Sequence, residues 1–148
     1  MNQVVFETQG DWDTTTLICN GEEFLAAQMF VHLVAGRDDF GEPTSGGIYL
    51  GGEITAIVRP QDNPNEEIGI LPGRLEMRFP NHQIVIENMH PGFAFEATRV
   101  YYNGSDVTDD VLEVLVDIDS IRNNVEAHLM LYRDRFLLRD EIATFKIL

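Results

Sequence analysis

The fold is decided by residues 14–35, TTTLICNGEEFLAAQMFVHLVA. A short β-prone segment leads to Asn20-Gly21, and a long apolar run follows from Phe24 to Ala35. Asn and Gly both tolerate positive φ, so this dipeptide favours the tight turn of a β-hairpin. The stretch therefore predicts a strand, a turn and a second strand.

A second Asn-Gly unit lies in residues 97–119, ATRVYYNGSDVTDDVLEVLVDID. Aligning its Asn103-Gly104 with Asn20-Gly21 gives an offset of 83 residues (103 − 20). Alternate residues of the two long runs are then apolar in both units, which is strand periodicity. The aligned pairs are Met29 with Leu112, Val31 with Val114, Leu33 with Val116 and Ala35 with Ile118. The pattern leaves open whether the two units are a true duplication or two similar hairpins.

Two segments also carry features of helices. In residues 20–36, Asn20 precedes Glu23 by three positions, as in a capping box, and Gly36 would suit a helix C-terminus. Residues 108–123 would also form an amphipathic helix. We expect strands in both segments, because the two share the same period of two.

The same alternation recurs through the rest of the chain. Residues 74–86 predict a hairpin that turns at Pro80-Asn81, and residues 48–58 predict a strand with a bulge or bend at Gly51-Gly52. Residues 125–132 and 136–148 predict a final pair of strands. Shorter strands are expected at 4–6 and 93–97, and loops at 36–47 and 60–72. We expect one all-β domain over residues 1–148, a hairpin-rich and mostly antiparallel sandwich or barrel with room for one short helix.

The chain is strongly acidic. It has 10 basic and 25 acidic residues, for a formal charge of −15. Such a surface repels phosphate backbones and anionic lipids, so we expect no direct binding of nucleic acids or membranes. High solubility explains the charge most simply, and a basic protein partner stays open. Nine of the ten basic residues are Arg, which predicts paired carboxylates between strands or at an interface, or reflects genome composition alone.

The residue types that carry out catalysis are scattered. Cys19 is the only cysteine, which excludes an intrachain disulfide, and its apolar strand predicts a buried, inert thiol. The four histidines lack metal-ligand spacing, although His82 and His90 would meet across a hairpin loop. They are His32, His82, His90 and His128.

Two acidic segments contain the residue types of metal or catalytic sites. The first, from Asp106 to Asp119, has the oxygen ligands that calcium prefers but not the order of a calcium loop, so a solvated strand face is expected. The second, Asp11-Trp12-Asp13, is too common a pattern to indicate a glycosidase. The chain also lacks nucleophile-elbow, Walker and dinucleotide motifs. We therefore expect no catalytic residue, no cofactor site and no metal site, and no enzyme.

Residues 100–116 resemble a pattern of tail, baseplate and hub proteins of tailed bacteriophages. In that pattern an apolar strand ends in Asn-Gly, and Asp-Val-Thr-Asp and an alternating apolar strand follow, as they do here from Asn103 to Val116. Residues 125–136 resemble the later strand and Asp-rich turn of the pattern, although the usual turn glycine is missing. The resemblance implies a structural module of a virion, with no catalytic residues.

These observations predict a structural or assembly protein of a tailed phage or related particle, a homo-oligomer or a binder of other virion proteins. The segment that begins at Met1 lacks the features of a signal peptide, so we expect assembly in the host cytoplasm, or a cytoplasmic protein if the phage interpretation fails. The alternative is an acidic inhibitor that mimics nucleic acid and binds a host nucleic-acid-binding or defence protein. A third, weaker hypothesis is a carbohydrate- or small-molecule-binding sandwich that uses Trp12 and Tyr49.

Overall fold

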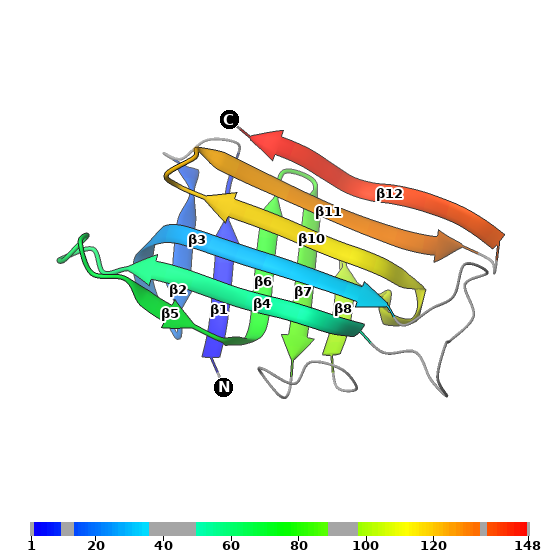
Figure 1. Ribbon diagram of the computed structural model, residues 1–148, viewed down its shortest axis with the longest axis horizontal. Coiled ribbons are helices and arrows are strands. Elements are labelled where there is room, and N and C mark those ends of the chain that lie inside the picture. The colour runs from blue at the N-terminus through cyan, green and yellow to red at the C-terminus, as the bar shows by residue number, and fades with distance from the viewer. Residues whose placement is uncertain (1, 10–13, 36–49, 89–97, 134–135, 148) are drawn as a thin grey trace.

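The protein is all-β, as predicted, with its strands arranged in two layers (Figure 1). The computed structural model describes residues 2–9, 14–35, 50–88, 98–133 and 136–147. Asp11-Trp12-Asp13, Tyr49, His90 and the strand expected at 93–97 lie outside these ranges. The elements are β1 (Asn2–Glu7), β2 (Thr16–Cys19), β3 (Glu22–Ala35), β4 (Leu50–Arg59), β5 (Ile68–Ile70), β6 (Pro72–Phe79), β7 (His82–Asn88), β8 (Thr98–Tyr102), β9 (Ser105–Asp106), the 3-10 helix η2 (Thr108–Asp110), β10 (Val111–Asp119), β11 (Asn124–Arg133) and β12 (Phe136–Ile147).

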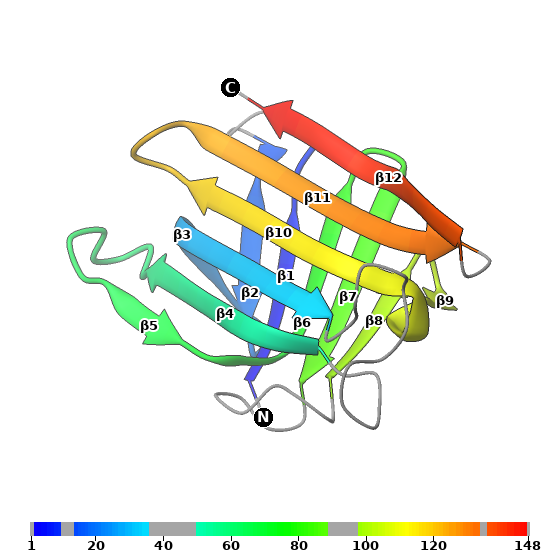
Figure 2. The same ribbon diagram turned by 45° about the vertical axis from the view of Figure 1, so that its right-hand side comes forward.

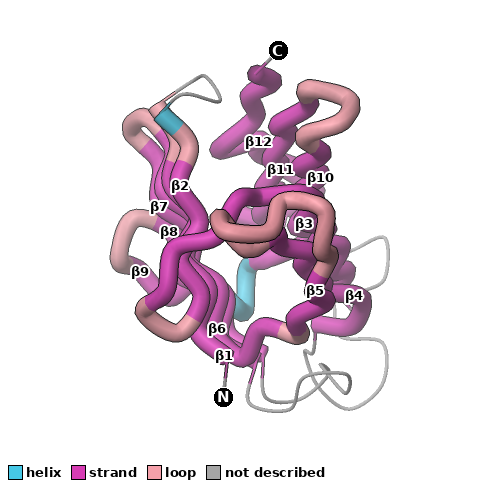
Figure 3. Tube along the Cα trace, turned by 90° about the vertical axis from the view of Figure 1, so that its left-hand side faces the viewer, coloured by secondary structure: helices cyan, strands magenta, loops and turns pink. Residues whose placement is uncertain are grey.

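One long strand, β3, joins the two layers into a single curled sheet. Its first residues pair with β2 in sheet A, whose order is β2-β1-β6-β7-β8-β9. From Leu25 onward it pairs with β4, and from Gln28 onward also with β10, in sheet B, whose order is β5-β4-β3-β10-β11-β12. The strands of sheet B cross those of sheet A at a steep angle, and the two layers are visible from the side (Figures 2 and 3).

The core lies between the two layers and follows the period of two. On β10, for example, Val114, Val116 and Ile118 are fully buried, whereas the residues between them are half-buried on the outer face. The same alternation places Val4 and Phe6 of β1 inside and Val5 outside. Each strand therefore contributes one apolar row to a shared core.

Both segments that resembled helices are mainly strands. Residues 22–35 form β3, and residues 111–119 form β10 after the short 3-10 helix at 108–110. The hairpin predicted for 74–86 is confirmed as β6 and β7, and the final strand pair as β11 and β12. Tertiary pairing on both edges of β3 and β10 decides the structure of these segments, where local propensity alone is ambiguous.

Two details differ from the sequence prediction. The register of β4 with β3 is continuous through Gly51-Gly52, and the bulge lies on β3 between Ala26 and Gln28 instead. This is the point at which β3 passes from sheet A to sheet B, and a bulge supplies the extra bend and twist needed there. The predicted loop over 60–72 also contains β5, whose three residues pair with β4.

The two Asn-Gly turns have the same geometry. Asn20 and Gly21 have φ of 52° and 84°, and Asn103 and Gly104 have 47° and 86°. The Asn20 N–H donates to the Gln3 carbonyl at 2.8 Å, and its Oδ1 accepts from the Gln3 N–H at 2.9 Å. Asn103 makes the same two bonds with Gln83, at 2.9 and 2.8 Å.

The strands that receive these bonds are also alike. Gln3 begins the sequence Gln-Val-Val-Phe-Glu in β1, and Gln83 begins Gln-Ile-Val-Ile-Glu in β7. The long strands that follow the two turns, β3 and β10, are antiparallel neighbours in sheet B. The similarity between the units thus extends to their hydrogen bonds, and their origin by duplication stays a prediction.

Candidate functional site

The three histidines that the structure describes lie on different strands, β3, β7 and β11. His32 Nε2 lies 3.2 Å from Glu113 Oε2 across β3 and β10. His82 Nδ1 lies 2.5 Å from the Tyr102 hydroxyl, with the two rings stacked at 5.9 Å. His128 lies on β11 beside Leu115. Within the ranges that the structure describes, His, Cys, Asp and Glu do not form a group of three or more that could hold a metal ion.

The only cysteine is buried in the core. Cys19 is 3% exposed, and burial, with a smaller effect of Glu22, raises the pKa of its thiol to about 11. A thiol with that pKa is almost fully protonated at neutral pH and is a poor nucleophile. The predicted burial of this residue is confirmed.

The acidic stretch from Asp106 to Asp119 is held by local contacts. The Thr108 hydroxyl and backbone N–H donate to Asp106 Oδ1 at 2.6 and 3.0 Å. The Arg122 guanidinium donates to both Asp117 and Asp119, at 2.9 Å to each. These carboxylates therefore stabilise turns and strand ends, and part of their bonding capacity is already used.

The bonds from Thr108 give the stability of the protein a dependence on pH. They hold the pKa of Asp106 below its usual range, with a smaller contribution from Arg99. Because the folded-state pKa is lower than the unfolded value of about 3.9, the stabilisation is present above that pH and is lost as the pH falls through the folded pKa. We expect Asp106→Asn to be less stable than the wild type at neutral pH and to approach it in acid.

Urea denaturation of both proteins at neutral pH and near pH 2.5 measures this difference. Asp109→Asn is the matched control. Asp109 lies three residues further along, in the 3-10 helix η2, where its side chain is exposed and has no hydrogen-bond partner among the described residues. A wild-type advantage over Asp106→Asn that grew in acid would contradict the assignment.

The outer face of sheet B carries three cross-strand rows over β4, β3 and β10, which we call the acidic face. The alternation that buries Met29, Val31 and Ile54 directs the residues between them outward. The rows are Glu53–His32–Leu115, Thr55–Phe30–Asp117 and Ile57–Gln28–Asp119. Beyond β10, Asp117 lies opposite Glu126 of β11, and two like charges in register are unfavourable unless a cation offsets them. Arg122 supplies one such cation.

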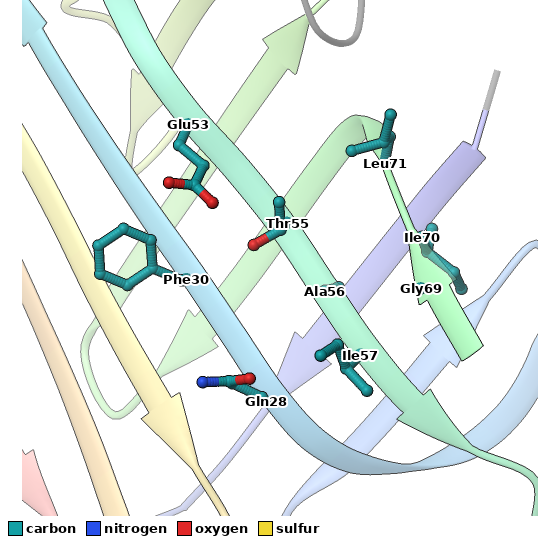
Figure 4. Close-up of a pocket in the computed structure, with 9 residues that line it drawn as sticks. All are labelled: Gln28, Phe30, Glu53, Thr55, Ala56, Ile57, Gly69, Ile70 and Leu71. Carbon is teal, nitrogen blue, oxygen red and sulfur yellow. The ribbon is translucent and has the colours of Figure 1, made fainter. Parts of the chain in front are cut away.

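A groove crosses the edge of the acidic face next to β5. Its first part has a volume of about 550 Å³, and Figure 4 shows the side chains around it. A second part of about 290 Å³ shares Gln28 and Ile57 with the first and continues to Asp119 and Ile121. The first part is lined by Gln28, Phe30, Glu53, Thr55, Ile57 and Leu71, among others.

The groove exists because one position of a row has no side chain. Gly69 of β5 lies directly opposite Ile57, and would continue the row Asp119–Gln28–Ile57. A Cβ added at Gly69 would meet nothing within 4 Å. The glycine therefore leaves open the space that a larger residue would occupy.

The outer face of sheet A carries a charged network centred on Glu76. This residue lies between Val5 of β1 and Val85 of β7, and it is 8% exposed. Its Oε2 accepts from Arg78 at 2.7 Å and its Oε1 from Gln83 Nε2 at 2.8 Å, with Arg74 at 3.8 Å. Arg78 also lies 3.2 Å from Glu7 of β1, and Arg74 lies 3.6 Å from Glu87 of β7, so arginines pair with carboxylates between strands, as the composition predicted.

The long edge of the sheet is formed by β12. Nine of its twelve residues have a Cα partner on β11, and in the part of the chain that the structure describes no strand pairs with its other edge. At about 3.3 Å per residue this edge is about 40 Å long. The remaining edge strands, β5 and β9, have three and two residues. Open strand edges readily pair with another strand.

Comparison with known proteins gives no relative: no family model, no curated protein and no solved structure matches the chain. None of the described segments is a helix long and apolar enough to cross a bilayer. The β12 edge and the groove have no signature in the amino-acid sequence, because both depend on which strands become neighbours.

Proposed function

We propose that the protein is a non-catalytic structural or assembly component of a tailed bacteriophage or related particle. It acts through protein–protein contacts, with itself or with other virion proteins. The observation that supports this proposal best is the open edge of β12, which offers a row of backbone donors and acceptors about 40 Å long. The resemblance of residues 100–116 to phage tail proteins supplies the class of particle.

Pairing through this edge is tested at Ile142. The register of β12 with β11 passes from Glu141 to Ala143, so Ile142 lies at a bulge and has no Cα partner. Proline is tolerated at bulges and edge strands, but it removes a donor and discourages a further strand. We expect Ile142→Pro to lower the mass measured by light scattering from an oligomer to one chain, whereas Ile142→Ala keeps the oligomer.

Hydrogen exchange supplies a second readout on the unmodified protein. Amides of residues 136–147 should gain protection as the protein concentration rises, whereas those of β1, already paired on both edges, should not change. A wild-type monomer at high concentration, or equal assembly of the two Ile142 variants, would count against self-assembly through this edge.

We propose a second function, supported by the acidic face: an acidic inhibitor of a nucleic-acid-binding or defence protein. Glu53 on β4 and Asp117 and Asp119 on β10 belong to this face, and Glu113 of β10 and Glu126 of β11 lie beside it on the outer side of the sheet. Capture of a basic host protein that weakens steeply between low and high salt would favour this function over the first.

A further inference from the structure

We propose that the groove beside β5 binds an extended segment of a partner protein that carries a large apolar side chain and, four residues away on the same side, a lysine or arginine. The proposal rests on the function above, because it assumes a protein partner, and it assigns that partner's chemistry. The groove and the β12 edge lie at opposite ends of the order of sheet B, so each is tested without the other.

The floor of the groove is apolar. Phe30 and Ile57 are half-buried on the outer face, where their neighbours in the rows are polar. The two ends carry large exposed side chains, Leu71 at 49% and Ile121 at 81%. Apolar residues at the floor and at both ends suit a ligand with its own apolar side chains.

Carboxylates at the rim of the groove favour a positively charged ligand. Glu53 has no ion-pair partner among the described residues, so its carboxylate is available to a cation. Glu67 and Asp119 add two further carboxylates. Each has an arginine partner, Arg59 at 3.0 Å from Glu67 and Arg122 at 2.9 Å from Asp119. The balance at the rim is negative, in a chain of charge −15. A basic segment is therefore attracted and an acidic one repelled.

The position of the groove favours an extended segment. It runs across the outer side of β3, β4 and β5, and Gly69 leaves the lateral space beside Ile57 open. β5 pairs only with β4 in the described chain, so its outer edge borders the same space. Glu53 and Ile57 lie four residues apart on β4 and face the same side, which separates them by about 13 Å. An extended chain that places one side chain into the hollow at Gly69 therefore brings a cation to Glu53 four residues further along, because every second residue of an extended chain faces the same side.

The test uses three fluorescein-labelled peptides and anisotropy. The first, the Lys-Leu peptide, has two repeats of Leu-Ser-Ser-Ser-Lys-Ser-Ser-Ser, which place Leu and Lys on the same side of an extended chain four residues apart. The Lys-Ser peptide has Ser in place of each Leu, and the Glu-Leu peptide has Glu in place of each Lys. We expect the Lys-Leu peptide to bind the full chain, the Lys-Ser peptide to bind about tenfold more weakly, and the Glu-Leu peptide not to bind. Equal binding of the Lys-Leu and Lys-Ser peptides would overturn the proposal, because it would show attraction by charge alone.

Two variants assign the binding to the groove. Gly69→Phe fills the hollow at a position where an added Cβ meets no atom within 4 Å, and should weaken binding about tenfold without loss of thermal stability. If Phe lowers stability, Gly69→Val replaces it. Glu53→Arg should weaken binding by a similar factor, whereas Glu23→Arg, the same charge change at an exposed site outside the groove, should change it less than about twofold.

The outcomes separate this proposal from the proposed function. No binding of the Lys-Leu peptide, or equal effects of Glu53→Arg and Glu23→Arg, would overturn the groove and leave assembly through β12 unaffected. Binding abolished by Ile142→Pro but not by Gly69→Phe would place the peptide on the β12 edge and also overturn the groove. Binding lost in Gly69→Phe, with the oligomeric state unchanged, would support it.

Discussion

Replacing Phe6 by alanine is expected to lower the free energy of unfolding by about 3–5 kcal/mol, the range for aromatic residues truncated in a core. Phe6 is completely buried, and its ring lies 6.0 Å from that of Phe79. Its strand pairs with β2 on one edge and with β6 on the other, so little room exists for neighbours to move into the cavity. Urea denaturation of both proteins, analysed with the same m-value, measures the loss in the free energy of unfolding.

The matched control for Phe6 is its neighbour Val5. Val5 lies on the same strand but is half-buried on the outer face, so Val5→Ala should cost about 1 kcal/mol or less. Comparable losses for the two variants would mean that the layers do not enclose the inner face of β1 as described.

The sequence predicts this inner face well. Alternation along residues 29–33 and 114–118 identifies the buried rows, since a strand must turn every second residue to the core. It is wrong at Leu112, because a bulge between Val111 and Glu113 places Val111 in the core instead. The Asn-Gly and Pro-Asn turns likewise place two-residue hairpins correctly, because Asn20, Asn81 and Asn103 adopt positive φ. All-β class, hairpins and core residues therefore follow from local chemistry.

The neighbours of each strand do not follow from local chemistry. Alternation with a period of two indicates which residues of a strand share a face. It does not indicate that β1 pairs in parallel with β6, about 70 residues away in the chain. The bulge on β3, which carries one strand through both layers, depends on the same pairing. The groove is a further step removed, because it needs Gly69 to lie opposite Ile57. In the sequence alone, without the register of β5 on β4, Gly69 is indistinguishable from an ordinary loop glycine.

The burial of Glu76 is another consequence of strand pairing that cannot be predicted from the sequence. Arg74, Glu76 and Arg78 alternate on one strand, which indicates only a polar outer face. In the sheet, apolar neighbours on β1 and β7 cover the central carboxylate, while its arginine partners stay 33% and 50% exposed. The exposed arginines can be hydrated after a substitution, but the covered carboxylate cannot.

The double variant Arg74→Ala/Arg78→Ala should therefore lose about 3 kcal/mol of its free energy of unfolding. This is the lower end of the range for removing one partner of a buried ion pair and leaving the other charge uncompensated. The Gln83 bond to Glu76 survives in it, which limits the loss. Adding Glu76→Leu should regain most of that stability, because an apolar side chain suits the place between Val5 and Val85. Urea denaturation of the wild type, the double and the triple variant gives both steps. A triple variant less stable than the double would show that packing by the arginine stems, and not the isolated carboxylate, caused the loss.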